Sequence, residues 1–218
     1  MDILNIMIQR HSVRVYEDKS IEDDKKEILN DLIKNLNIEY GTNVQIVYDD
    51  AELFSNSEAS YGRFSGCKNI VALVAKNAEI AGYVGELVVL KAQEIGLNTC
   101  FVALTYNKGA VKRKIRKEAG EKIQCCIAIG YGKNQGKRRT SKTLKDVLIL
   151  KGEKPEFLEQ VVEACLLAPT AINQQKFKVV STDGNIDIKK SGIGFYTDVD
   201  LGIIKCHKDL ILKEYMKK

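Results

Sequence analysis

The fold is decided by residues 68–76, KNIVALVAK, together with 82–96, GYVGELVVLKAQEIG, and 98–104, NTCFVAL. The first and third stretches are short apolar runs between polar residues, a pattern typical of buried strands. The second is apolar around most of its circumference and ends at Gly96, a residue favoured just after the last turn of a helix. We therefore expect a strand, a buried helix and a second strand at the centre of the protein.

Outward from this centre, helical and extended patterns are mixed. Helices are expected at 2–9, 21–36 (with Ser20 as its cap), 109–121, 156–167 and 200–215, strands at 43–50, 122–132 and 176–182, and loops at 51–66 and 184–197. In the extended segment 10–18, RHSVRVYED, alternation places Val13 and Val15 on one face and Ser12, Arg14 and Tyr16 on the other. The elements do not follow strict βαβ order, so we predict a layered α+β fold.

Composition excludes several classes of protein. The chain has 218 residues and a formal net charge of +5, from 34 basic and 29 acidic residues. It has no long Lys/Arg run and no zinc-finger or RNA-binding signature, so no nucleic-acid partner is expected. The longest apolar run, Ile70–Ala75, is far short of the roughly 20 residues that span a bilayer. The N-terminal MDILNIMIQR does not resemble a signal peptide, so we expect a cytoplasmic protein with no membrane partner.

The six cysteines form no CxxC pair, and five of them lie within apolar runs, where cysteine behaves as a small hydrophobic residue. We expect buried thiols in a reducing compartment. Only His11 and His207 are available as further nitrogen ligands, and no metal-binding spacing results. No metal site is expected.

The order of elements recurs along the chain. A basic, Ser-containing segment, an amphipathic helix, a polar loop and a strand follow Arg10 and follow again after Arg138. In each case a loop and a similar helix come next, at 85–96 and 200–212. Either the chain consists of two related halves, 1–137 and a shorter 138–218, or amphipathic patterns coincide by chance, since the identity between the copies is low.

Three segments have the residues for ligand binding. In the first, Arg10, His11, Ser12 and Arg14 suit a phosphate, because guanidinium groups form charge-assisted hydrogen bonds with its oxygens and the serine hydroxyl adds a neutral donor. More distant partners would be Arg138, Arg139 and Lys142. The alternative is a solvated edge whose arginines form surface ion pairs with Glu17 and Asp18.

The other two segments are loops next to apolar elements. In 168–175, APTAINQQ, the amides of Asn173 and Gln174 suit the edge of a heterocycle with alternating donors and acceptors, unless this is ordinary helix-stop chemistry. In 96–104, GLNTCFVAL, a glycine turn and a strand can present backbone N–H groups to a ligand, unless the stretch is only a core strand.

Together these motifs resemble the FMN-dependent nitroreductase family. The segment RHSVRVYED is similar to its Arg-[Arg/His]-Ser-x-[Arg/Lys] motif, and 167–180, LAPTAINQQKFKVV, to its Ala-Pro-Ser-x-x-Asn-x-Gln-Pro-Trp-x-Phe motif. The stretch 85–102 resembles the central helix and following strand, and 127–147 the basic C-terminal stretch. Here the Pro-containing loop follows the basic stretch, an order that resembles a subgroup with two fused half-units in one chain.

The resemblance implies a mixed sheet flanked by helices, FMN as the cofactor and a set of site residues. It places Arg14 near the flavin N1–C2=O edge, where a guanidinium stabilises the reduced ring and so has a catalytic role. It implies phosphate and ribityl contacts from the N-terminal and basic segments, and contacts around the ring from the two loops. These cofactor-binding residues are Arg10, His11, Ser12, Arg14, Arg138, Arg139, Pro169, Thr170, Ala171, Asn173, Ala103 and Leu104.

The implied function is that of an oxidoreductase that passes hydride from NAD(P)H through the flavin to a small acceptor such as a nitroaromatic or a quinone. A monomer that acts as a pseudo-dimer is expected rather than an obligate homodimer, because the two motif sets lie in different halves of one chain. The alternative is a flavin-binding module without catalysis, which stores cofactor, senses redox state or binds a partner protein.

Overall fold

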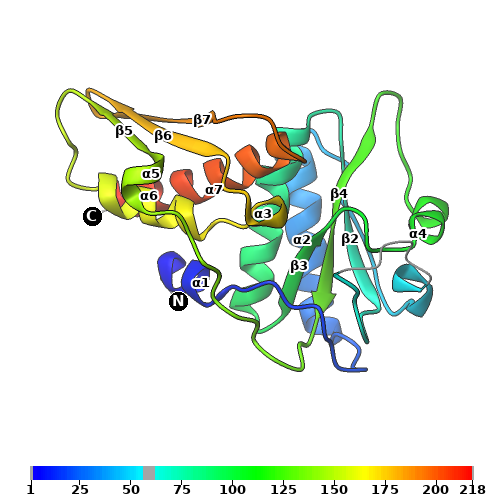
Figure 1. Cartoon of the computed structure of the whole chain (residues 1–218). Helices are drawn as coiled ribbons and strands as arrows, with labels where there is room; N and C mark the ends of the chain where they lie inside the picture. The colour runs from blue at the N-terminus through cyan, green and yellow to red at the C-terminus, as the bar shows by residue number, and fades with distance from the viewer. Residues whose placement is uncertain (1, 56–61, 218) are drawn as a thin grey trace.

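The computed structural model describes residues 2–55 and 62–217, in which two β-sheets are joined by a central pair of helices (Figure 1). The first sheet is antiparallel, and the second combines a parallel pair with an antiparallel pair. In spatial order the strands of the first sheet are β1 (Gln45–Val47), β2 (Asn69–Ala75), β4 (Lys122–Gly130) and β3 (Asn98–Val102). Those of the second are β5 (Leu148–Lys151), β6 (Phe177–Thr182) and β7 (Asn185–Lys190). The α+β prediction is confirmed.

Helices pack on and between the sheets. They are α1 (Ile3–Gln9), α2 (Asp23–Tyr40), α3 (Ala78–Glu94), α4 (Lys108–Lys114), α5 (Leu144–Val147), α6 (Leu158–Leu167) and α7 (Thr197–Tyr215), with short 3₁₀ turns η1 (Ala51–Phe54) and η2 (Ala171–Asn173). None of the helices among the described residues combines the length and apolar character needed to cross a membrane.

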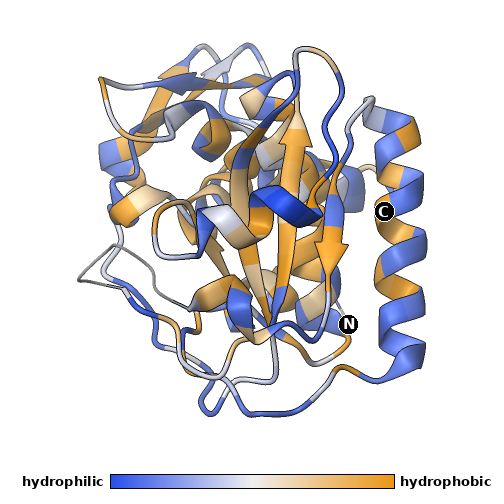
Figure 2. Cartoon of the chain, turned by 90° about the vertical axis from the view of Figure 1, so that its right-hand side faces the viewer, coloured by the Kyte–Doolittle hydropathy of each residue, from blue (hydrophilic) through white to orange (hydrophobic). Residues whose placement is uncertain are grey.

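The central strand–helix–strand prediction is confirmed. Every residue of β2 is buried, and α3 packs against β2, β3 and β4. Gly96 has φ +80° just after α3, the left-handed conformation that lets a glycine end a helix. Hydrophobic colours fill the strands at the centre of Figure 2, while hydrophilic colours dominate the surrounding loops. All six cysteines are buried thiols.

Helices α3 and α7 pack extensively against each other. These are the helices that the predicted repeat pairs with each other, and they cross directly, with the first sheet beyond α3 and β7 packed on α7 (Figure 1). Helix α6 packs on α7, and α1 contacts α3, α6 and α7. The helical layer thus brings the N-terminal segment next to the second half of the chain.

The predicted alternation in residues 10–18 is wrong. Val13 and Tyr16 are buried, whereas Arg14 and Val15 are exposed. The reason is that this segment forms isolated bridges to three different partners, Ser12 to Thr99, Val15 to Ser65 and Tyr16 to Gly132, instead of one regular ladder. Without a continuous neighbour, the period of two is lost.

Several predicted boundaries also change. Helix α2 begins after Glu22 rather than at a Ser20 cap, and the helix expected at 109–121 ends at Lys114. The predicted loop 184–197 contains β7. Ile188 is the only buried residue of this strand, and the exposed lysines and aspartate make the segment too polar to be recognised as a strand. Part of the predicted loop 51–66 forms η1, and residues 56–61 lie outside the described residues.

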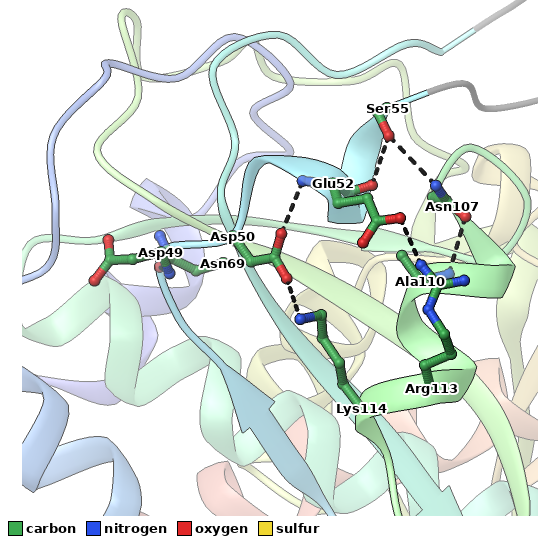
Figure 3. A network of polar contacts seen from close by, with 9 residues as sticks. All are labelled: Asp49, Asp50, Glu52, Ser55, Asn69, Asn107, Ala110, Arg113 and Lys114. Carbon is green, nitrogen blue, oxygen red and sulfur yellow. Dashed lines mark hydrogen bonds and ion pairs between the residues drawn. The ribbon is translucent and has the colours of Figure 1, made fainter.

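A polar network fastens η1 to α4 (Figure 3). Asp50 accepts a hydrogen bond from the Glu52 N–H and pairs with Lys114 at 2.6 Å, while Glu52 pairs with Arg113. Asn107 caps α4 through Ala110 N–H and donates to the Ser55 hydroxyl. Each surface ion pair of this kind contributes little to the free energy of folding. The caps Asp50 and Asn107, in contrast, fix where η1 and α4 begin.

Candidate functional site

A pocket of about 500 Å³ lies between α1, α6 and the segment that follows β4. Figure 1 shows this segment passing beside α1 on its way to α5. One wall is apolar and comes from α1 and α6, through Leu4, Met7, Ile8, Leu166 and Leu167. The rest is polar and mostly basic, and consists of Arg10, His11, Arg138, Arg139, Ser141, Lys142, Glu163, Asn173 and Gln175.

Two arginines of the lining are removed from solvent to different degrees, Arg10 being buried and Arg139 half-buried. Arg10 is 4% exposed, directly after the last turn of α1, and its Nε has no hydrogen-bond partner among the described residues. Burial lowers the pKa of Arg10, and burial followed by repulsion from Arg10 lowers the pKa of Arg139 to about 10. Both effects mean that the positive charges of the two arginines are not fully compensated, and an anion in the pocket would compensate them.

The turn after α6 holds the basic segment in place. Asn173 Nδ2 donates to Thr140 O at 2.7 Å, and Gln175 Nε2 donates to Ser141 Oγ at 2.8 Å. Gln175 Oε1 accepts from the Lys142 N–H at 2.8 Å, and Lys142 Nζ donates to Gln175 O at 2.7 Å. Asn173 Oδ1 is buried without a partner among the residues described. The turn therefore fixes the basic segment opposite Arg10.

This turn is strained. Ile172, Asn173 and Gln175 have φ of 46°, 56° and 42°, values that side chains other than glycine rarely adopt. Such backbone persists where surrounding contacts impose it, often at functional sites. The second set of contacts comes from Asp200 on α7, which accepts from Ala171 N–H at 2.9 Å and from Gln174 Nε2 at 2.7 Å. Gln174 thus faces α7 instead of the pocket.

The Cys100 thiol connects the pocket with Ser12 and Arg14. Burial raises its pKa, while Arg14, a hydrogen bond with Ser12 and the charges of Arg10 and Arg139 lower it. Arg14 itself is exposed and lies beside Gly62. Ser12, which bridges to Thr99, therefore lies next to Cys100 on β3, while Arg10 lines the pocket and Arg14 does not.

The structure divides the predicted site residues into two groups. The pocket lining includes Arg10, His11, Arg138, Arg139 and Asn173, and the first and last of these lie 163 positions apart in the sequence. Outside the lining lie Ser12, Arg14, Ala103, Leu104, Pro169, Thr170 and Ala171. Sequence reasoning missed Ser141, Glu163, Gln175 and the apolar wall, although Gln175 belongs to the amide-rich loop 168–175, which is predicted to bind a ligand.

The donor set suits the phosphate of a nucleotide. Guanidinium, ammonium and imidazole groups converge from α1 and the basic segment, and the unpartnered Arg10 Nε is a donor without an acceptor. A pocket of this volume is within the usual range for small-molecule sites. Within residues 2–55 and 62–217, no group of three His, Cys, Asp or Glu side chains is placed to hold a metal ion.

The fold and the pocket together define an α+β protein with a candidate anion-binding site between α1, α6 and the segment that follows β4. A family model described as "Putative TM nitroreductase" matches residues 2–211, and the chain belongs to that family. No protein with a curated description matches the chain.

Solved structures share the fold. A "putative nitroreductase" from Thermotoga maritima has a TM-score of 0.70 and 22% identity, and covers 100% of this chain and 87% of its own. A "putative nitroreductase in complex with FMN" from Desulfovibrio desulfuricans has a TM-score of 0.55 and 17% identity, with 71% of this chain and 98% of that one covered. A "Putative NADH dehydrogenase/NAD(P)H nitroreductase" from Bacteroides thetaiotaomicron has a TM-score of 0.52 and 17% identity, over 66% and 95%.

Proposed function

We propose that the protein is an FMN-dependent oxidoreductase that passes hydride from NAD(P)H to a small organic acceptor such as a nitroaromatic or a quinone. The observation that carries the proposal is the pocket, where the buried Arg10 and the half-buried Arg139 have pKa values lowered by burial, in a chain of the nitroreductase family. A structure with this fold holds FMN, and another is described as an NAD(P)H nitroreductase.

In this proposal different residues bind the phosphate and the ring of the cofactor. Arg10, His11, Arg138 and Arg139 would hold the phosphate, and Lys142 would add further positive charge. Asn173 turns its unpartnered Oδ1 to a donor of the cofactor. Ser12, the end of β3 (Ala103, Leu104) and the loop residues Pro169, Thr170 and Ala171 would hold the ring.

Bound FMN supplies the reversible hydride chemistry that no amino-acid side chain provides. The protein's own contribution is binding and electrostatics. Arg14 is the residue proposed to stabilise the negative charge of the reduced ring, because a guanidinium presents a rigid fork of N–H donors to developing negative charge. An apolar wall from α1 and α6 borders the basic side of the pocket.

We also propose that residues 1–137 and 138–218 are two half-units, the second one shortened, that act as a pseudo-dimer within one chain. Support comes from the direct crossing of α3 and α7 between two separate sheets. The pocket lining also draws on both halves, with Arg10 from the first and Arg139 from the second. Size-exclusion chromatography with light scattering should give a monomer that binds one FMN; an obligate dimer with two flavins would overturn the pseudo-dimer.

The visible spectrum of the purified protein tests the cofactor, with mass spectrometry of whatever is released on denaturation. We expect a yellow protein that contains FMN, or a colourless one that binds added FMN. Under anaerobic conditions NADH or NADPH should bleach the colour, and a nitroaromatic or quinone should restore it. A flavin that binds but is never bleached would favour a binding module without catalysis. Failure to bind FMN at all would refute the proposal.

A further inference from the structure

The first sheet has an open edge at β1, and this edge lies between two helices. Strand β1 stands at the end of the order β1-β2-β4-β3, and β2 is its one partner among the described strands. A cavity of about 500 Å³ lies along β1, between residues of α2 and the end of α4. Its lining shares no residue with the pocket between α1 and α6, so the two sites are separate.

The register of β1 shows which backbone groups face this edge. In an antiparallel pair, the N–H and C=O groups of successive residues point alternately toward the partner strand and away from it. The Asn43 N–H donates to Val74 O at 2.9 Å, in the same register as β1 and β2, so the odd-numbered residues face β2. Val44 and Ile46 therefore turn their N–H and C=O groups to the open edge.

One of these two positions is already paired. Asn37 of α2 accepts from the Val44 N–H through Oδ1, at 2.7 Å, and donates to Val44 O through Nδ2, at 2.9 Å. Its side-chain amide takes the place that a residue of a neighbouring strand would occupy. Ile46 has no such partner among the described residues, so its N–H and C=O groups are available to an added strand.

The helices beside the edge offer apolar contacts to both faces of such a strand. Side chains of a strand alternate between its two faces. Ile33 of α2 belongs to the core on one face of the sheet, and Ile115, just after α4, belongs to the core on the other, and both line the cavity. Ile38 of α2 lines it too and is 76% exposed, so an aliphatic side chain placed against it would remove apolar surface from water.

The charge of the edge favours an acidic partner. Two lysines and no acidic residue line the cavity. Lys114 pairs with Asp50 at 2.6 Å (Figure 3), whereas Lys34 is exposed and forms no ion pair within the part of the chain that the structure describes. The exposed Arg116 is held beside β1, because its N–H donates to Gln45 Oε1 at 3.0 Å and its C=O accepts from Gln45 Nε2 at 2.7 Å.

These cations also argue against a second copy of the chain as the partner. Pairing two β1 edges would bring the same basic groups together, and like charges across neighbouring strands are destabilising. A segment with carboxylates would instead gain attraction from Lys34 and Arg116.

We propose that the open edge of β1 docks an extended, acidic segment of a partner protein, which adds a fifth strand to the first sheet between α2 and α4. The backbone of the segment pairs with Ile46, its aliphatic side chains contact Ile38 and Ile115, and its carboxylates pair with Lys34 and Arg116. The proposal concerns this edge alone and is independent of the cofactor.

Hydrogen exchange followed by NMR on the full-length protein tests the backbone pairing. In the free protein the Val44 amide should exchange slowly, because Asn37 holds it, and the Ile46 amide should exchange fast. The probe is a synthetic peptide mixture, about six residues long, in which Val or Ile alternates with Asp or Glu. Saturating peptide should slow the exchange of Ile46 by about tenfold or more and leave Val44 unchanged. An Ile46 amide that still exchanges fast at saturation would overturn strand addition.

Fluorescence anisotropy with the same mixture, labelled, measures affinity and its dependence on charge. Binding should saturate and should weaken as salt rises, and a mixture with Lys in place of Asp and Glu should not bind. Lys34→Glu should weaken binding by about tenfold or more, because it reverses an attraction. Ile38→Asp should weaken it similarly. Its matched control is Ile28→Asp, an exposed position of α2 outside the cavity, which should bind like the wild type.

Three results of this titration would contradict the proposal. The acidic mixture does not bind, or both mixtures bind alike, or Lys34→Glu and Ile38→Asp bind as the wild type does, which would place the peptide elsewhere, such as the pocket around Arg10. Light scattering tests the other occupant. A dimer of the wild type that Ile38→Asp dissociates would assign the edge to a second copy of the chain, and the acidic partner would be wrong.

Discussion

Gly82 of α3 and Gly202 of α7 each lie against the backbone of the opposite helix. An ideal Cβ on Gly82 would lie 2.0 Å from Val199 O, and one on Gly202 would lie 1.8 Å from Glu79 O. The two contacts are related by a shift of 120 residues, which takes Gly82 to Gly202 and Glu79 to Val199. Such reciprocity is what a two-fold axis produces between identical helices, so it supports the two half-units proposed above.

Gly82→Ala and Gly202→Ala should each destabilise the protein strongly. The added methyl group meets a backbone oxygen that cannot rotate away, so the two helices must separate and lose packing. We expect each variant to lower the free energy of unfolding by about 1–3 kcal/mol in urea.

Gly109→Ala in α4 is the matched control. The nearest atom to its ideal Cβ is a side-chain oxygen at 3.4 Å, so alanine should fit and stabilise the helix by up to about 1 kcal/mol. Equal effects at all three glycines would show that the α3–α7 contact has no special role.

The centre of the fold was predictable because its pattern is strong. Residues 69–75 and 78–94 are apolar enough that burial decides their structure, and the glycine after α3 marks its end. Strand β7 was missed because NIDIKK has one buried residue, Ile188, and its pairing with β6 is a tertiary effect that local sequence does not express. The order of the strands in the two sheets could not be predicted either, because local sequence patterns do not determine which strands pair.

For the site, the sequence indicates Arg10, Arg139 and Asn173 because clustered arginines suit a phosphate and a loop amide suits a heterocycle, and the structure places all three in one pocket. The buried pair of Glu86 and His207 was missed, although a signal existed. Glu86 is the only charged residue in the apolar run GYVGELVVL, and a carboxylate there must be paired or neutral once the helix is buried. Its partner His207 lies 121 positions away and is identified only by the helix crossing.

Arg139→Met should separate binding from stability. Loss of a charge-assisted contact to a phosphate costs about 1.5–3 kcal/mol, so FMN affinity should fall about 10- to 100-fold. The ligand-free protein should unfold at the same or a higher denaturant concentration, because a poorly compensated cation has been removed. Arg113→Met on α4, remote from the pocket, should change neither the affinity nor the colour of the protein.

Arg14→Ala should lower the midpoint potential of the bound flavin. If this guanidinium stabilises the reduced, anionic ring, its loss costs on the order of 2–4 kcal/mol in the reduced state alone. Equilibration with a reference dye of known potential measures the shift, and Arg14→Lys, which keeps the charge, should recover most of it. An unchanged potential with flavin still bound would contradict the role assigned to Arg14.

Asp200 should make stability depend on pH in a defined window. Burial is the main cause that raises its pKa to about 6, against the lowering effects of Gln174, the Ala171 N–H and the charge of Arg139. An aspartate in the unfolded chain titrates near pH 4. Between these values the folded state binds more protons than the unfolded state, so this residue's contribution to stability is full below about pH 4 and is lost as the pH rises through 6.

Asp200→Asn should therefore flatten the dependence of the unfolding free energy on pH between 4 and 6. The full effect of a shift of this size is about 3 kcal/mol, and the wild-type-minus-variant difference should change by an amount of that order across the window. Urea unfolding at half-unit pH steps measures it. Asp198→Asn, an exposed position in the same first turn of α7, should run parallel to the wild type. Parallel curves for Asp200→Asn as well would mean that this carboxyl ionises at its ordinary pH and that the strained turn does not depend on its charge.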